Sequence, residues 1–178
     1  MNERAIEVPI IWDIVKKSKG KILEIGNVLS HYYSVSHDIV DKYEKAKDVI
    51  NQDIVDFRPS ITYDLIISIS TLEHVGWDEI PREQGKILLA LDNLKLNCLA
   101  PSGKMVITLP LGQNSELDNF LSEDKIDIGK QYYLKRISKF NEWIEVGWND
   151  VKGIKYSFIT GANGIIIGIL ENYTLNNS

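Results

Sequence analysis

The sequence predicts an α/β protein with a mostly parallel sheet and a late antiparallel strand pair. Short apolar runs rich in β-branched residues alternate with helical segments along residues 4–110. These runs stop at Gly, Ser or Pro, as buried parallel strands often do. Near the C-terminus, a Gly/Asn turn separates two further apolar runs, which favours an antiparallel pair. We therefore expect one mixed sheet within a single domain, residues 1–178.

The amino-acid composition indicates a globular domain and argues against several other classes of protein. A chain of 178 residues with 44% hydrophobic and 25% charged residues is ordinary for a soluble globular domain. The net charge of −5 argues against a nucleic-acid partner, which usually requires a basic face. No apolar run approaches the length of a membrane span, so we expect no membrane contact and a cytoplasmic location. The single cysteine, Cys98, excludes a disulfide framework, and we expect no metal.

The first half of the chain predicts one helix followed by closely spaced strands. Residues 4–18 predict the helix, and Pro9 suits its first turn, so its regular part is expected to begin near Val8. A complete βαβ unit takes about 30 residues. The chain between Gly26 and Asp53 is too short for such units, so the crossover helices here are expected to be shortened or absent. The expected strands are residues 21–26, 39–40, 49–50 and 65–69.

The second half predicts a long helix, a strand and a hairpin. Leucines and isoleucines recur at steps of three and four in residues 81–99, which indicates a helix with a core-facing stripe. Ser138 is a plausible N-cap for another helix that would carry Phe140, Trp143 and Ile144. The remaining expectations are a strand at 104–109, a polar stretch at 111–136 with a short helix near 116–121, and hairpin strands at 154–159 and 165–170.

Acidic residues follow three of the expected strands. Glu24 precedes Gly26 at the end of the first strand, where ligands bind in open α/β sheets. Asp41 lies 17 residues after Glu24, a spacing that suits a carboxylate accepting ribose hydroxyls. Asp53, which Ile54 follows, comes after the next strand and could accept a hydrogen bond from an exocyclic amine. Each of these residues alone is more typical of an ordinary surface carboxylate.

The segment Tyr63–Val75 carries the strongest pattern. A buried strand runs into Ser70, Leu72 and the pair Glu73-His74. A lone Glu-His pair is usually an exposed loop, and a single histidine without a partner cluster does not make a zinc site. Its position after a buried strand nevertheless places the pair at the ligand end of the sheet.

Together these features resemble the class I S-adenosylmethionine-dependent methyltransferases. Tyr63–Val75 is similar to the family's "FDLI…S…LEHV" segment, and Leu99–Pro110 is similar to its "L-x-P-G-G" turn and fifth strand. The resemblance implies a Rossmann-like fold, S-adenosyl-L-methionine as cofactor, and an enzyme that methylates a small polar acceptor such as a glycan precursor or another metabolite.

The resemblance also implies roles for individual residues. Those expected to bind the cofactor are Glu24, Gly26 and Asn27 near methionine and ribose, Asp41 on the ribose, Asp53 and Ile54 on adenine, and Ser70, Leu72 and His74 near the sulfonium. The catalytic base is expected to be His74, with Glu73 as the second choice.

One departure from the family keeps a second interpretation open. Val28 and Ser30 stand where the family's loop has its second and third glycines. A degenerate methyltransferase-like fold that acts as a non-catalytic binding or assembly module is therefore the alternative. In that case, an apolar face left bare by the missing helices would be buried in a homodimer.

Overall fold

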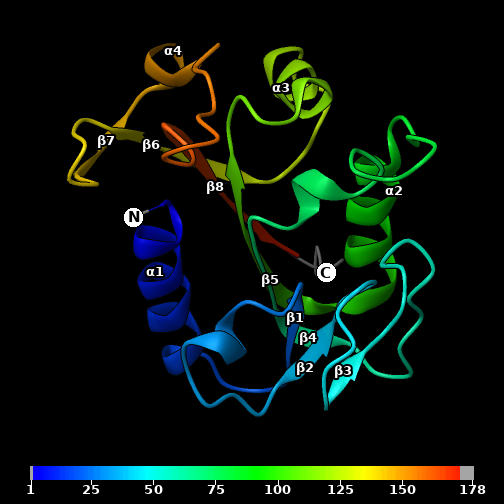
Figure 1. Cartoon of the computed structure of the whole chain (residues 1–178). Helices are drawn as coiled ribbons and strands as arrows, with labels where there is room; N and C mark the ends of the chain where they lie inside the picture. Colours follow the sequence, from blue (N-terminus) through cyan, green and yellow to red (C-terminus); the bar gives the residue numbers. More distant parts are fainter. Residues whose placement is uncertain (1, 173–178) are drawn as a thin grey trace, which may run out of the picture.

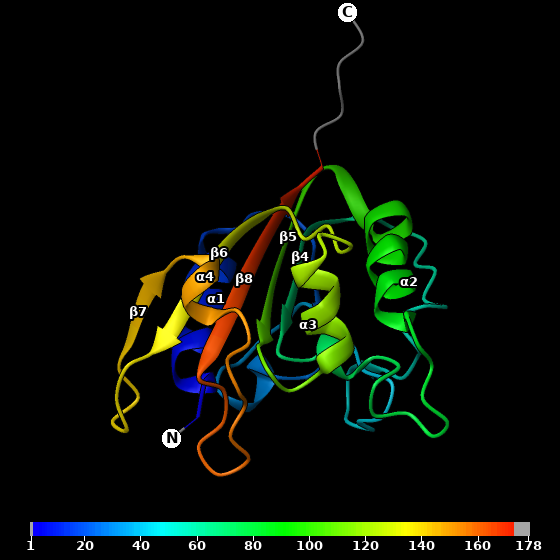
Figure 2. The same cartoon turned by 90° about the horizontal axis from the view of Figure 1, so that it is seen from above.

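The computed structural model of the chain describes residues 2–172. These residues form one eight-stranded sheet with the order β3-β2-β1-β4-β5-β8-β6-β7. Figures 1 and 2 show that α1 covers one face of the sheet and that α2 and α3 cover the other. The elements are α1 (Arg4–Lys17), β1 (Ile22–Ile25), η1 (Leu29–His31), β2 (Asp38–Val40), β3 (Val49–Ile50), β4 (Tyr63–Ile69), η2 (Leu72–His74), α2 (Lys86–Asn93), η3 (Leu94–Cys98), β5 (Leu99–Pro110), α3 (Ser115–Ser122), β6 (Lys130–Arg136), β7 (Trp143–Val146), α4 (Trp148–Val151) and β8 (Gly164–Glu171).

The predicted fold class is confirmed. The pairs β3–β2, β2–β1, β1–β4 and β4–β5 are parallel, whereas β8 runs antiparallel between β5 and β6. The side chains of β4 alternate between the two faces of the sheet. Leu65, Ile67 and Ile69 pack towards α1, whereas Ile66 packs towards α2. This two-sided burial explains why the strand is a continuous apolar run in the sequence.

The shortened helices of the first half are also confirmed. Between β1 and β2 the chain forms only η1, a single 3₁₀ turn, and no helix separates β2 from β3. The loop after η1 covers the sheet instead, with Tyr33 stacked on Trp12 of α1 at 4.2 Å between ring centroids. Leu29 is fully buried in the same cluster. The face expected to be bare is therefore covered by a loop in this region.

Two helix starts differ from the sequence expectation. Helix α1 begins at Arg4 rather than near Val8, with Pro9 inside it. Side chains of its first turn hold it to the sheet, because Arg4 donates to the carbonyl oxygens of Ile69 and Ser70. Helix α2 begins at Lys86 rather than Pro81, because Gly85 before it adopts φ = +72°, outside the helical region. Residues 94–98 continue α2 as a π-helical turn.

The last third contains two wrong assignments. The expected helix after Ser138 is a turn followed by strand β7, because Ser138 accepts hydrogen bonds from Phe140 and Asn141 and so closes the turn. The expected strand at 154–159 is a loop, and the partners of β8 are β5 and β6. Lys130–Arg136, expected to be irregular, forms β6, so Tyr132 and Tyr133 lie in the sheet.

Candidate functional site

A pocket of about 620 Å³ opens at the carboxyl ends of β1, β2 and β4. Its size suits a small-molecule ligand. It lies where open parallel sheets bind their ligands. The structure brings seven of the predicted residues to its walls: Gly26, Asn27, Asp41, Asp53, Ile54, Ser70 and His74. The other three, Glu24, Leu72 and Glu73, are buried behind the walls.

Glu24 organises the loop below the pocket. Its Oε1 accepts hydrogen bonds from the backbone amides of Val28 and Leu29, at 2.9 and 2.7 Å. Its Oε2 lies 2.6 Å from Nε2 of His37, which is also buried. All of these contacts hold the chain that replaces the first crossover helix. A direct cofactor contact stays a prediction for this side chain.

The chain after Gly26 follows a path that needs only one glycine. Gly26 has φ = +81°, and a Cβ atom there would lie 2.3 Å from Oγ1 of Thr71. Val28 has φ = −108°, which any residue adopts. Val28 and Ser30 are thus compatible with this backbone, although both replace glycines of the family's loop.

Asp41 lies at the end of β2 with one oxygen largely uncommitted. Its Oδ1 accepts hydrogen bonds from the amides of Tyr43 and Glu44, both at 2.8 Å. Within residues 2–172, its Oδ2 receives only a long contact of 3.4 Å from the amide of Asn27. Oδ2 is therefore an oriented carboxylate oxygen on the pocket wall. It can accept a hydrogen bond from a hydroxyl group of a ligand.

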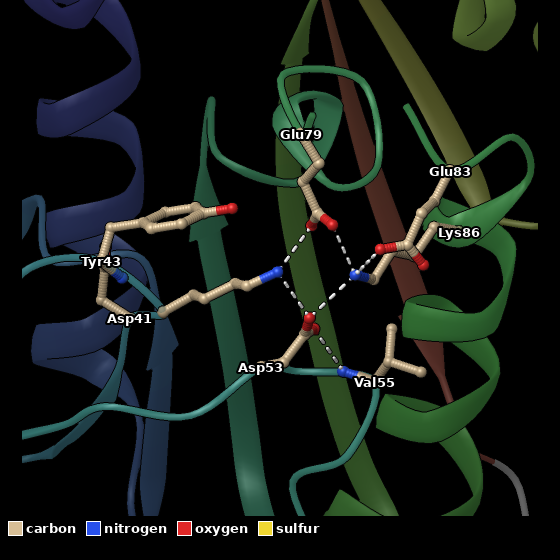
Figure 3. Close-up of polar contacts among 8 residues, drawn as sticks. Asp41, Tyr43, Asp53, Val55, Glu79, Glu83 and Lys86 are labelled. Atoms are coloured by element: carbon tan, nitrogen blue, oxygen red, sulfur yellow. Dashed lines mark hydrogen bonds and ion pairs between the residues drawn. The ribbon is translucent and has the colours of Figure 1, made fainter. Parts of the chain in front are cut away.

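Asp53 belongs to a network of charges at the far end of the pocket (Figure 3). Its Oδ2 lies 2.9 Å from Nζ of both Lys42 and Lys86, and its Oδ1 accepts from the amide of Val55 at 3.1 Å. Glu79 bridges the same two lysines at 2.9 and 2.7 Å. Burial opposes ionisation, but the hydrogen bonds from Lys42 and Lys86 lower the pKa of Asp53 to about 2. Both oxygens are engaged, so an adenine amine would compete with these partners.

His74 lies on the pocket wall next to two carboxyl groups. Its Nδ1 is 2.6 Å from Oδ2 of Asp78, which fixes the ring, and its Nε2 is 3.5 Å from Oε1 of Glu73. Its side chain is 40% exposed, whereas that of Glu73 is 1% exposed. Burial raises the pKa of Glu73 well above its usual value, and the nearby Glu7 adds to this. Neither oxygen of Glu73 has a hydrogen-bond partner within residues 2–172.

Two residues of α1 reach the site without having been predicted. Arg4 lines the pocket, and Oε1 of Glu7 accepts a 2.5 Å hydrogen bond from Oγ of Ser70. Burial raises the pKa of Glu7, with the bond from Ser70 opposing it. A signal was present in the sequence, because Glu7 occupies the same helical stripe as the buried Ile11 and Val15. An acid on an apolar stripe indicates a buried polar contact.

Similarity to solved structures is found across nearly the whole chain. An N-methyltransferase, NodS, from Bradyrhizobium japonicum in complex with S-adenosyl-L-homocysteine has a TM-score of 0.53 at 14% identity, over 96% of this chain and 87% of that one. The 1,6-didemethyltoxoflavin-N1-methyltransferase from Burkholderia thailandensis has a TM-score of 0.53 at 9% identity, over 97% and 80%. A TehB-like S-adenosylmethionine-dependent methyltransferase from Corynebacterium glutamicum has a TM-score of 0.50 at 19% identity, over 94% and 87%.

Sequence comparison adds no relative: no family model and no curated protein matches the chain. The structural likeness covers 94–97% of this chain. The chain therefore has the Rossmann-like fold of the class I S-adenosylmethionine-dependent methyltransferases.

Proposed function

We propose that the protein binds S-adenosyl-L-methionine in this pocket and methylates a small polar acceptor. The observation that carries the proposal is Asp41, which two backbone amides hold at the end of β2 with Oδ2 available to the pocket. Ile25, Val40 and Ile54 add apolar wall beside it. This combination of apolar walls and a few oriented acceptors fits a nucleoside-bearing ligand.

When bound, the cofactor supplies an electrophilic methyl group on a sulfonium. The protein's own contribution is to orient the acceptor, exclude water and receive the acceptor's proton. In this proposal, Nε2 of His74 accepts that proton while Asp78 holds Nδ1 and stabilises the imidazolium. Glu73 acts behind His74 as a positioning residue, since it is buried. The acidic residues around the pocket, with Asp41, Asp78 and Glu79 on its walls, are compatible with a cationic ligand.

Binding is tested by titration calorimetry with S-adenosyl-L-homocysteine. We expect Asp41→Ala to weaken binding by roughly tenfold or more, because it removes hydrogen bonds to a charged acceptor. Asp56→Ala is the matched control, since Asp56 is exposed and does not line the pocket. Absence of binding by the unmodified chain at millimolar ligand would refute the proposal.

Catalysis is tested separately, with methyl transfer to a panel of small hydroxyl and amine acceptors. We expect His74→Gln to reduce kcat by about 10²- to 10⁴-fold with little change in cofactor affinity. A variant that loses affinity and rate in parallel would assign His74 to binding rather than to proton transfer.

One observation favours the alternative of a non-catalytic binding module. Lys42 and Lys86 already satisfy Asp53, the residue predicted to read adenine. In that case the pocket binds a ligand other than a nucleoside. The protein then acts by binding or assembling with a partner rather than by transferring a methyl group. The same calorimetric titration separates the two functions, because only the methyltransferase binds S-adenosyl-L-homocysteine.

A further inference from the structure

Two hairpin tips in the last third present large apolar side chains to solvent. The first is the turn after β6, residues 137–142, and the second is the loop before β8, residues 157–161. Together they define the apolar tips, with exposed fractions of 55% for Ile137, 77% for Phe140, 93% for Phe158 and 95% for Ile159. Scattered exposed apolar residues are ordinary, but a group on neighbouring turns indicates an interaction surface.

Both tips have well-formed backbones. The amide of Gly161 donates to the carbonyl of Ser157 at 2.7 Å, and Oγ of Ser157 accepts from the amides of Ile159 and Thr160. In the other tip the amide of Ile137 donates to the carbonyl of Glu142 at 2.9 Å. The hydrogen bonds hold the backbone of each tip in place, which lowers the entropic cost of docking.

The two tips are side by side. Nη1 of Arg136, at the base of the first tip, donates to the carbonyl of Thr160 in the second at 2.6 Å. The Arg136 amide also donates to the carbonyl of Asn163 at 2.9 Å. The two tips are therefore neighbours in space, and each presents apolar side chains to solvent.

The charge around the tips differs in sign from that of the whole chain. Residues 130–160 contain six Lys or Arg and three Asp or Glu, whereas the chain carries a net charge of −5. Lys139 and Lys155 are exposed next to the apolar tips, and Nζ of Lys139 lies 5.3 Å from the ring centroid of Phe140. Glu142 is an exposed acid in the first tip. Apolar side chains next to the two exposed lysines complement an anionic partner that also offers apolar volume.

The apolar tips and the pocket lie at one edge of the sheet. Pro110 at the end of β5 pairs with Ile165 near the start of β8, and Lys135 near the end of β6 pairs with Gly164. The tips therefore project from the edge at which the parallel strands end (Figure 2). This edge also carries the pocket.

We propose that the apolar tips dock the protein on the surface of a membrane that contains anionic lipids. Bilayer headgroups and acyl chains together match the combination of lysines and apolar side chains. Two of the four exposed apolar residues of the tips are isoleucines. Single-stranded nucleic acid is bound mainly by aromatic stacking and cations, so this composition favours lipid.

This contact differs from membrane spanning. No helix within residues 2–172 is long and apolar enough to cross a bilayer. Interfacial docking needs only shallow burial of a few apolar side chains, assisted by nearby cations. The expectation of no membrane contact rested on the lack of an apolar run long enough to span a bilayer, and that does not describe shallow docking by this surface.

The test is co-sedimentation of the full chain with vesicles of phosphatidylcholine, with and without phosphatidylglycerol. We expect binding to the anionic vesicles only, weakened by salt. The double variant Phe158→Ser, Ile159→Ser should lose roughly tenfold or more in affinity, and Lys139→Glu with Lys155→Glu should remove the preference for anionic lipid. Leu96→Ser is the matched control, because Leu96 is 81% exposed in η3, before the start of β5 at the opposite edge.

The proposal would be overturned by no binding to anionic vesicles at low salt, by an equal loss in the Leu96→Ser control, or by a dimer in light scattering that the double variant converts to a monomer. Tighter binding to single-stranded nucleic acid than to vesicles would also assign the surface elsewhere. Circular-dichroism melting of each variant shows that it is folded. None of these readouts depends on methyl transfer, so failure here leaves the proposed activity untouched.

Discussion

The two halves of the sheet are stabilised by different means. In the half formed by β1, β2 and β3, strands are two to four residues long, and the loops after them are held by buried or half-buried carboxylates. In the half formed by β5, β8 and β6, strands are seven to twelve residues long and are joined by continuous ladders. Where helices are missing, hydrogen bonds to Glu24, Asp41 and Asp53 take their place. The pocket lies in the half that depends on charged side chains.

The largest effect should come from Glu24→Ala in the first half. The substitution leaves the amides of Val28 and Leu29 and the ring of His37 without their buried acceptor. Removing one partner of a buried charged network costs about 3–5 kcal/mol. Urea unfolding followed by circular dichroism should show this loss. Ile167→Val, in β8 of the second half, should cost only about 0.5–1.5 kcal/mol. Equal losses at the two sites would contradict the comparison.

Two glycines with similar backbone angles provide the next test. Gly26 and Gly153 have φ of +81° and +73°, but a Cβ atom meets Thr71 at 2.3 Å in the first case and nothing within 4 Å in the second. We expect Gly153→Ala to cost about 1 kcal/mol from the backbone alone. Gly26→Ala should cost more, by about 1–3 kcal/mol, because Thr71 must also move. Thermal melts of the two variants measure the difference in lost stability. A smaller loss for Gly26→Ala than for Gly153→Ala would show that the loop after β1 moves to make room for the methyl group.

The same contrast explains what the sequence could predict. Residues 21–26, 65–69 and 104–109 are predictable as strands because both faces of the sheet are covered there and apolar runs signal such burial. The spacing of Phe140, Trp143 and Ile144 suits a helix and a turn with a strand equally, so local pattern could not decide between them. Trp143–Val146 forms a strand because it pairs with β6 in the sheet, and the local spacing of residues does not encode this pairing.

The site was predictable where topology alone places a residue. Asp41 and His74 reach the pocket because each follows a parallel strand, and strand ends share one edge. The hydrogen bond between Glu7 and Ser70 links residues 63 positions apart, so no local pattern places them together. The engagement of Asp53 by Lys86 is likewise set by how α2 packs, which residue spacing does not encode.

Glu73 lies in η2, after the central strand β4. Its buried carboxyl should make the free energy of unfolding decrease as pH rises. Its folded-state pKa is raised by burial, so the folded state binds a proton more tightly than the unfolded one. The resulting stability is complete below the ordinary pKa and is lost as pH rises through the folded pKa. Between these two pKa values, a rise of one in pH costs about 1.4 kcal/mol. Glu73→Gln should therefore gain stability relative to the unmodified chain at pH 8 but not at pH 4.

Urea unfolding at the two pH values measures this effect. Glu142→Gln, an exposed acid of the second half, is the control and should change stability equally at both. Asp53 and Glu79 have pKa values lowered to about 2, because hydrogen bonds from Lys42 and Lys86 outweigh burial. Their contribution has the opposite sign and is lost only as pH falls from about 4 towards 2. A Glu73→Gln variant that gains nothing at pH 8 would show that this carboxyl finds a partner when ionised.

The smallest effect should be on ligand affinity, from Lys42→Ala. Lys42 connects Asp53 with Glu79, and it is about one-third exposed, so its ion pairs contribute little to stability. Its removal leaves Asp53 with Lys86 and returns acceptor capacity to the pocket end where adenine is proposed to bind. S-adenosyl-L-homocysteine should then bind about two- to fivefold more tightly, as expected for the loss of one weak competing pair. Lys95→Ala, which breaks an ion pair with Asp127 outside the pocket, should leave affinity unchanged. Weaker binding in Lys42→Ala would instead mean that Lys42 itself contacts the ligand, and the charged network would then be part of the binding surface rather than its competitor.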